Sequence, residues 1–345
     1  MRPTVPRSFL IIQTAFIGDV ILATALIEKL HQYFPDAEID FLLRKGNETL
    51  LRGHPFVRNV MVWDKKKHKV RNLIQITRRV RSLKFDYVID IHRFFSSGLI
   101  ALFSNAKYII GFDKNPVSFL FTKKVKHVIQ KGIHEIDRNQ KLIDGITDER
   151  AARPRLYPSA NDYAAAHAYQ VPSLSETKYI CLAPASVWFT KQFPQVKWIE
   201  FMDRPEVSKF YIVLLGAAAD HALCESLRIA SKHGHVINLA GHLSYLESAA
   251  LMQGAIMNYV NDSAPLHLAS AMNAPVTALF CSTIPAFGFG PLSDVRYVVE
   301  TEEKLSCRPC GLHGYRACPQ GHFKCALTVR VAQLSEILEN PGFKQ

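Results

Sequence analysis

Short apolar runs alternate with helix-like segments along most of this chain, and this alternation constrains the fold more than any other feature. Several runs are apolar at every position, as expected for strands buried on both faces of a parallel sheet. In the segment after the first run, Ala23, Ile27, Leu30 and Phe34 keep a helical three-to-four spacing. Such alternation is typical of doubly wound α/β sheets. The expected strands are residues 9–13, 39–43, 60–63, 87–91, 108–110, 179–183, 211–215, 236–239, 256–260 and 276–281.

The alternation pauses between about residues 148 and 177, where Pro154, Pro158 and Pro172 stand among small and polar residues. A chain of 345 residues is long enough for two domains. We therefore predict two Rossmann-like domains facing a cleft, over residues 1–160 and 175–330. A short helix at 163–169 is expected in the linker, and residues 331–345 are expected to form a C-terminal helix and tail. Ligands of open α/β sheets bind beyond the carboxyl ends of the strands, so the residues just after each strand are the candidates.

The net charge is +12, and much of it lies in three clusters of the first half, KKKHK at 65–69, RRVR at 78–81 and KKVK at 123–126. Such charge attracts nucleic acid, a phospholipid surface or a phosphorylated substrate, although a single cluster can also be a solvated face. The most apolar long stretch, residues 8–26, is interrupted by Gln13, Thr14, Gly18 and Asp19. It fits neither a transmembrane helix nor a secretory signal. We therefore expect a cytosolic protein.

The run NDSAPLH at 261–267 is the most informative candidate site. It follows a strand-like run and precedes a helix-like one. A turn of this kind leaves backbone N–H groups at the start of a helix, where the helix dipole favours an anion such as a phosphate. Asp262 or Ser263 can cap this helix, and His267 lies one turn in. An ordinary helix cap would explain the same residues.

Other strand ends also carry reactive side chains. Asp19 follows the first strand and opens a helix, where it can stay ionised and accept a proton, or simply cap the helix. After the strand ending near residue 183, Ser186 and Thr190 offer hydroxyls, and Lys191 offers a charge for phosphate oxygens. Asp220 follows the next strand and can bind ribose hydroxyls or cap a helix.

Two nucleotide-binding motifs are absent. No expected strand is followed by G-x-G-x-x-G, and no G-x-x-x-x-G-K-[ST] is present. These absences argue against a nicotinamide-dependent Rossmann oxidoreductase and against a P-loop kinase.

Several segments together resemble the ADP-heptose:lipopolysaccharide heptosyltransferases of glycosyltransferase family 9. The similar segments are residues 14–26 with IGDV at their centre, the lysine loop at 185–194, NLAG at 238–241 with the following LE at 246–247, and residues 261–280. Their order and spacing agree with the family, and the resemblance covers nearly the whole chain. One residue departs from it, because Ala264 stands where the family usually has glycine. Its backbone N–H is retained, but its methyl group would lie close to a bound diphosphate.

The resemblance implies a GT-B type glycosyltransferase, with the acceptor bound by the N-terminal domain and the nucleotide sugar by the C-terminal one. Asp19 would be the catalytic base. Asp220 would bind the ribose of the donor, and Leu243 would lie near the adenine. Asp262 would orient the phosphate-binding turn or contact the donor sugar. The residues around the diphosphate would be Ser186, Thr190, Lys191, Ser263, Ala264 and His267.

The implied reaction inverts the anomeric centre without a metal ion. The donor would be ADP-heptose and the acceptor the anionic, lipid-linked Kdo–lipid A inner core. The protein would work as a monomer at the inner membrane face, with no nucleic acid as partner. Another nucleotide sugar is the alternative donor, and a basic nucleic-acid-binding protein with a cysteine-bound zinc is the alternative function.

The chain has seven cysteines, an odd number for a disulfide framework. Three lie in apolar runs and are expected in the core. The other four form the pattern C-x2-C-x7-C-x6-C at Cys307, Cys310, Cys318 and Cys325. Four thiolates so close in sequence suggest a structural zinc, with free thiols or a labile disulfide as alternatives. The proposed transfer itself requires no cofactor.

Overall fold

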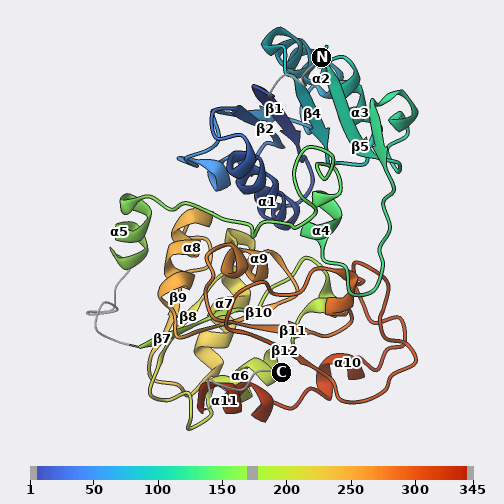
Figure 1. The fold of residues 1–345 in the computed structure, drawn as a ribbon. Helices are drawn as coiled ribbons and strands as arrows, with labels where there is room; N and C mark the ends of the chain where they lie inside the picture. Colours follow the sequence, from blue (N-terminus) through green and yellow to red (C-terminus); the bar gives the residue numbers. More distant parts are fainter. Residues whose placement is uncertain (1–5, 169–177, 340–345) are drawn as a thin grey trace. The chain divides into compact units, whose positions relative to one another are not determined.

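The computed structural model describes residues 6–168 and 178–339. The chain folds into two compact units, Met1–Tyr157 and Pro158–Gln345, which are called here the N-terminal and the C-terminal unit (Figure 1). Each is a parallel six-stranded sheet with helices packed on its faces. Within the described part of the chain, no helix has the length and apolarity needed to cross a membrane.

The N-terminal sheet has the strand order β3-β2-β1-β4-β5-β6. Because β4 adds beside β1, on the side opposite to β2, the direction of winding reverses between β1 and β4. The strands are β1 (Ser8–Ile12), β2 (Glu38–Arg44), β3 (Asn59–Trp63), β4 (Tyr87–Asp90), β5 (Tyr108–Phe112) and β6 (Lys123–Val125). The helices are α1 (Ile17–Tyr33), α2 (Lys69–Leu83), α3 (Phe95–Leu102) and α4 (Glu135–Gln140), with short 3-10 turns η1 (Glu48–Leu51) and η2 (Ser118–Leu120).

The C-terminal sheet repeats this topology in the order β12-β11-β10-β7-β8-β9, and its winding reverses between β7 and β10. Its strands are β7 (Tyr179–Ala183), β8 (Tyr211–Leu214), β9 (Val236–Asn238), β10 (Met257–Asn261), β11 (Val276–Phe280) and β12 (Arg296–Glu300). Its longer helices are α5 (Ala160–Ala168), α6 (Gln195–Met202), α7 (His221–Ala230), α8 (Tyr245–Gly254), α9 (Ala264–Ala271) and α11 (Ala332–Glu339). The short turns are η3 (Phe189–Lys191), η4 (Ala218–Asp220), η5 (Pro285–Phe287) and α10 (Lys324–Leu327).

The central strands form because their residues are apolar on both faces. All five residues of β7, β10 and β11 are buried. Side chains of these strands pack with Trp198 and Phe201 of α6 and with Leu334 and Ile337 of α11 in one core. The C-terminal helix therefore belongs to the C-terminal unit.

All ten strands expected from the sequence are present, and the expected fold of two Rossmann-like α/β units is confirmed. Two further strands, β6 and β12, were not expected; both lie at the edge of a sheet. The helix expected at 163–169 is α5, which begins earlier and packs on α8 rather than standing alone in a linker. Residue 169 lies outside the described residues.

Candidate active site

Each sheet presents its candidate residues at the point where the winding reverses, which is where ligands bind in open α/β sheets. In the C-terminal unit, the loop after β7 lies beside the start of α9 after β10. Asn261 joins them, because its side chain accepts from the N–H of Phe193 at 3.0 Å and donates to the carbonyl of Pro184 at 2.7 Å. This loop, residues 184–194, is called here the lysine loop.

Lys191 and Asp262 form an ion pair in this place. The Nζ of Lys191 lies 2.7 Å from Oδ2 of Asp262, and the two side chains are only 15% and 8% exposed. The hydroxyl of Thr283 donates to the same oxygen at 2.6 Å. Asp262 therefore orients the lysine and does not cap α9.

The N-terminus of α9 offers backbone donors to a ligand. Ser263 is the N-cap residue, but its side chain makes no capping hydrogen bond. Among the described residues, no acceptor is bonded to the backbone N–H of Ser263 or Ala264. Pro265 has no N–H to contribute, and these two groups directly follow Asp262, the ion-pair partner of Lys191. His267 lies one turn further and is 6% exposed.

The two hydroxyl residues of the lysine loop differ in their surroundings. Thr190 is buried, and its Oγ1 accepts from the N–H of Tyr315 at 2.8 Å and from the Ser282 hydroxyl at 3.0 Å. This hydroxyl is engaged inside the protein and joins the loop to the cysteine segment at Tyr315, and its role in donor binding stays a prediction. Ser186 is half-buried, and its carbonyl accepts from the Gln192 side chain at 2.6 Å.

Asp220 and Leu243 follow β8 and β9, the strands beyond β7 in the sheet. The Asp220 carboxylate accepts from the N–H of Ala217 at 2.8 Å, so its capping role is present in the structure. Both side chains are half-buried. Gly241 packs closely against Ala218, because a Cβ at position 241 would lie 2.7 Å from Cα of Ala218. This contact joins the loop after β9 to the loop after β8.

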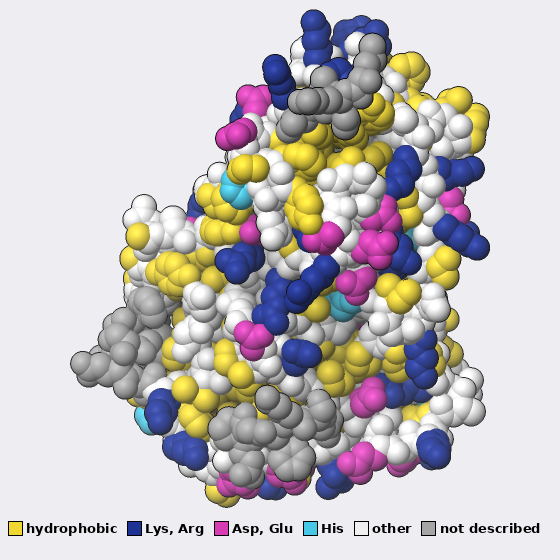
Figure 2. Space-filling model, viewed as in Figure 1, with side chains coloured by type: hydrophobic (Ala, Val, Ile, Leu, Met, Phe, Trp, Pro, Cys, Tyr) yellow, Lys and Arg dark blue, Asp and Glu magenta, His cyan; other side chains and the backbone are white. Residues whose placement is uncertain are grey.

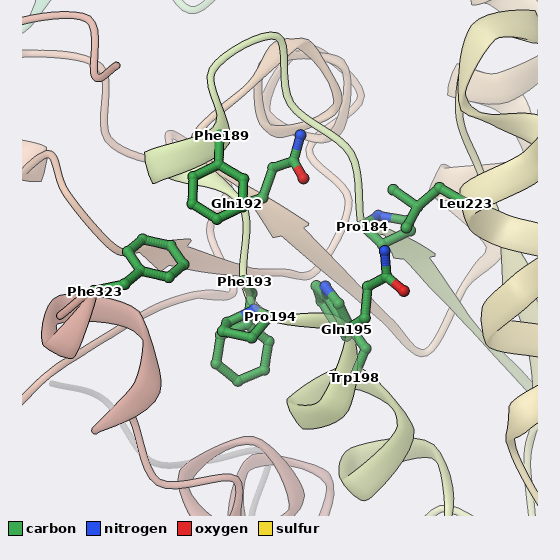
Figure 3. A pocket seen from close by; sticks show the side chains of 9 residues that line it. All are labelled: Pro184, Phe189, Gln192, Phe193, Pro194, Gln195, Trp198, Leu223 and Phe323. Atoms are coloured by element: carbon green, nitrogen blue, oxygen red, sulfur yellow. The ribbon is translucent and has the colours of Figure 1, made fainter. Parts of the chain in front are cut away.

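An apolar pocket lies behind the lysine loop and is distinct from these polar groups (Figure 3). Its walls come from the loop, from α6, from Leu223 of α7 and from Phe323, whose ring lies 5.0 Å from that of Phe189. No charged side chain lines it. A diphosphate would gain no charged contact there, so we do not assign the pocket to the donor.

The cysteine segment does not form the expected zinc site. Within residues 6–168 and 178–339, no group of three or more His, Cys, Asp or Glu side chains is placed so that it could hold a metal ion. Burial raises the pKa of Cys325 to about 11, and burial together with Cys307 and Cys318 raises that of Cys310. These two groups are therefore thiols near neutral pH in the metal-free protein. The segment instead braces the lysine loop through Tyr315.

In the N-terminal unit, Asp19 occupies the corresponding position after β1. It is the third residue of α1, and its Oδ2 accepts from the N–H of Phe16 at 3.2 Å. Gly18 is the second residue of this helix. Burial raises the pKa of Asp19, and the Phe16 N–H, Arg93 and Arg44 oppose this shift. The carboxylate is thus more basic than one simply stabilised by a helix N-terminus.

A polar network around Asp19 was not expected from the sequence. Lys65 donates to the hydroxyl and the carbonyl of Thr14 at 2.7 and 3.1 Å, and that hydroxyl lies 2.9 Å from Nδ1 of His92. Burial lowers the pKa of His92 to about 3 and that of Lys65 to about 8. The cations Arg44, Lys65 and Arg93 all contribute to the shift at His92, so they surround one place. Among the described residues, none of these three cations forms an ion pair with a carboxylate.

Arg44 is the last residue of β2, Lys65 follows β3 by two residues, and His92 and Arg93 follow β4 by two and three. The rule of inspecting each strand end, applied to every strand, would have found them.

Comparison with known proteins identifies related enzymes. The sequence model of glycosyltransferase family 9 (heptosyltransferase) matches residues 73–313. Lipopolysaccharide heptosyltransferase 3 of Escherichia coli (strain K12) is 25% identical over 281 aligned positions, in an alignment that covers 78% of this chain and 81% of that protein.

Two solved structures have the same fold over nearly the whole chain. The family 9 glycosyltransferase from Veillonella parvula DSM 2008 superposes with a TM-score of 0.85 at 19% identity, covering 97% of each chain. The E. coli ADP-heptose lipopolysaccharide heptosyltransferase II gives 0.81 at 20% identity, over 97% of this chain and 98% of the other. With most of its length matched by the family model, the chain belongs to glycosyltransferase family 9, the heptosyltransferases.

Proposed function

We propose that this glycosyltransferase is a lipopolysaccharide heptosyltransferase that transfers heptose from ADP-heptose to a hydroxyl of the Kdo–lipid A inner core, with inversion. Its membership of family 9 supports the reaction class, and the names of its relatives refer to lipopolysaccharide and to ADP-heptose. The N-terminal unit would hold the acceptor and the base, and the C-terminal unit the donor. One chain would carry both parts, so we propose that the monomer is active.

The observation that carries this proposal is the arrangement at the start of α9. Two backbone N–H groups without an acceptor lie beside a largely buried lysine, where the winding of the sheet reverses. Such a site suits a diphosphate, because amide dipoles and a fixed cation stabilise negative charge without reorganising. Asp220 and Leu243, at the neighbouring strand ends, are proposed to contact ribose and adenine. Ser186 and His267 are proposed to complete the diphosphate site.

In the proposed step, the acceptor hydroxyl oxygen attacks the anomeric carbon of the donor. The bond from that carbon to the β-phosphate oxygen breaks, and its electron pair leaves with ADP. Asp19 takes the hydroxyl proton, a role that the raised pKa of its carboxyl supports. Lys191 and the Ser263 and Ala264 amides stabilise the charge that develops on the β-phosphate. We propose that this cationic bed replaces a metal ion, so activity should persist in a chelator.

The cations around Asp19 support an anionic acceptor. Arg44 and Arg93 interact with the candidate base, and Lys65 lies on Thr14 beside His92. Among the described residues these cations form no ion pair, and a phosphorylated or carboxylated sugar would supply the missing negative charge. The inner core is such a molecule. We propose that the protein meets it at the cytoplasmic face of the inner membrane.

The test is to incubate the purified protein with ADP-heptose and inner-core lipid, to weigh the product and to determine its anomeric configuration by NMR. A mass gain of one heptosyl residue, with inversion, is expected. A parallel panel of other nucleotide sugars tests whether the methyl group of Ala264 changes the donor that the enzyme uses. Transfer from one of these, with none from ADP-heptose, would replace the proposed donor and leave the enzyme class intact.

A further inference from the structure

The N-terminal unit carries a strongly basic surface over α2. This helix and the residue that follows it expose Lys69, Arg71, Arg78, Arg79, Arg81 and Lys84. Residues 65–84 contain no Asp or Glu, and within the described chain none of these six side chains forms an ion pair. Figure 2 shows Lys and Arg side chains gathered at the top of the view, over the region where Figure 1 draws α2, with hydrophobic side chains beside them.

Exposed apolar side chains stand next to this basic surface. Phe94 and Phe95, at the start of α3, are 64% and 54% exposed, and Phe119 and Leu120 of η2 are 71% and 58% exposed. The side chain of Asn115, four positions before Phe119, donates to the Phe94 carbonyl at 3.0 Å, so the segment that leads into η2 contacts the start of α3. The helices α2 and α3 pack against each other on the same face of the sheet. The basic helix and the two apolar pairs are called here the docking face.

This combination suits an anionic lipid surface. Cations without carboxylate partners are attracted to acidic headgroups, and protruding aromatic and aliphatic side chains gain by entering the interface between headgroups and acyl chains. A solvated basic face explains the charges but leaves four large apolar side chains exposed to water. Residues 114–131, on either side of η2, add five lysines and no carboxylate.

The position of the docking face also suits the reaction. Phe94 directly follows Arg93, one of the cations beside Asp19, at the carboxyl edge of the N-terminal sheet. A bilayer that received the Phe94–Phe95 pair would bring its headgroups close to the candidate base.

We propose that the docking face binds the surface of an anionic phospholipid bilayer, and that the Phe94–Phe95 and Phe119–Leu120 pairs enter its interface. The catalytic benefit rests on the proposed function, whereas the binding itself does not. The two can therefore fail separately.

The experiment measures co-sedimentation of the full chain with phosphatidylglycerol-containing vesicles, without any sugar donor. The triple variant Arg78→Gln/Arg79→Gln/Arg81→Gln is expected to lower the partition coefficient by about 100-fold, since each cation near an acidic surface contributes several-fold. The double variant Phe119→Ser/Leu120→Ser is expected to lower it about tenfold. Ile229→Ser and Lys232→Gln, exposed positions of the C-terminal unit, are the matched controls and should bind as the parent does.

Equal binding of parent and both docking-face variants would overturn the proposal, and so would equal binding to phosphatidylcholine vesicles. Binding of a single-stranded oligonucleotide with no binding to vesicles would assign the surface to nucleic acid instead. Thermal unfolding midpoints show whether each variant is folded. Transfer to a water-soluble acceptor fragment should survive in the docking-face variants. If the parent protein also fails to transfer heptose to this fragment, the proposed function is contradicted, but the proposed binding to the bilayer is not.

Discussion

Asp19 combines two tasks that a single substitution can separate. Its carboxylate caps α1 through the Phe16 N–H and is proposed to accept the acceptor proton. Asp19→Asn keeps an oxygen for the cap but removes the base, so transfer should fall by roughly 10²–10⁴-fold while ADP affinity and folding are retained. Glu247→Gln, which changes the same kind of cap at the start of α8, is the control. Near-normal turnover of the asparagine variant would exclude Asp19 as the base.

The same residue predicts an acid limb in the pH profile. Burial raises the pKa of Asp19 above its ordinary value of 3.8, and only the ionised form is a base. As the pH falls through the raised pKa, Asp19 becomes protonated, and kcat/KM should decrease by about tenfold per pH unit. The measurement is kcat/KM for the acceptor from neutral to acidic pH. An acid limb at or below 3.8 would contradict this assignment.

Lys65 should act at the opposite end of the pH range. Burial and Arg44 lower its pKa to about 8, so it is charged below that pH and loses its proton above it. If it holds an acceptor anion, the acceptor KM should rise as the pH passes about 8. Lys65→Arg should abolish this rise, because a guanidinium stays charged. A rise that persists in the arginine variant must come from another group.

The pair of Lys191 and Asp262 can be tested by a double-mutant cycle. Lys191→Ala should weaken ADP binding and lower kcat by roughly 10²–10³-fold, and it also leaves a buried carboxylate without its cation. Adding Asp262→Asn should restore much of the lost stability but none of the activity. Lys197→Met on α6, whose partner Glu200 is exposed, is the control. Recovery of transfer in the double variant would show that the lysine acts only on stability.

Part of this site could be predicted from single residues, and part depended on distant contacts. The strand-end rule placed Asp19, Lys191 and Asp262, because the carboxyl ends of parallel strands share one edge. The burial of Thr190 could not be foreseen, because its partner Tyr315 lies 125 positions further along the chain.

At the level of elements, the pattern predicted ten strands because their sequences are apolar runs. It missed β6 and β12 for the opposite reason. The three residues of β6 include two lysines of a basic cluster, and Arg296 and Glu300 end a strand whose middle residues alone are apolar. Both strands lie at a sheet edge, but β3 and β9 lie at the other edges and were predicted, so the charged residues of β6 and β12 are what hid them.

The brace between the cysteine segment and the lysine loop gives a prediction at this scale. Gly314 has φ +77°, and a Cβ there would lie 2.9 Å from Oγ1 of Thr190 and 3.0 Å from Cγ of Lys191. Gly314→Ala should displace the loop and weaken ADP binding, measured by calorimetry, by about tenfold. Gly321→Ala introduces the same kind of backbone strain at φ +71° with nothing within 4 Å, and it should bind ADP normally. Equal ADP affinities in the two variants would show that the contact between the cysteine segment and the lysine loop does not support ADP binding.

At the scale of the whole molecule, the charge is divided very unequally. The N-terminal unit has 28 Lys and Arg against 15 Asp and Glu, a net charge of +13, whereas the C-terminal unit has a net charge of −1. In the proposed division of labour, the acceptor meets the strongly positive unit and the donor meets a nearly neutral one with a local phosphate site. Long-range attraction should therefore contribute to acceptor capture far more than to ADP binding.

Salt separates these two contributions, because the Debye length falls from about 10 Å at 0.1 M to about 3 Å at 1 M. Raising sodium chloride across this range should increase the acceptor KM at least about tenfold, since exposed charges are screened. The dissociation constant for ADP should change by less than about threefold, because Lys191 and the α9 amides act at contact distance in a largely buried place. The ADP affinity could instead fall with salt as steeply as the acceptor KM rises. That result would show that long-range attraction acts on the donor as well, and it would contradict the proposal that the N-terminal unit binds the acceptor and the C-terminal unit the donor.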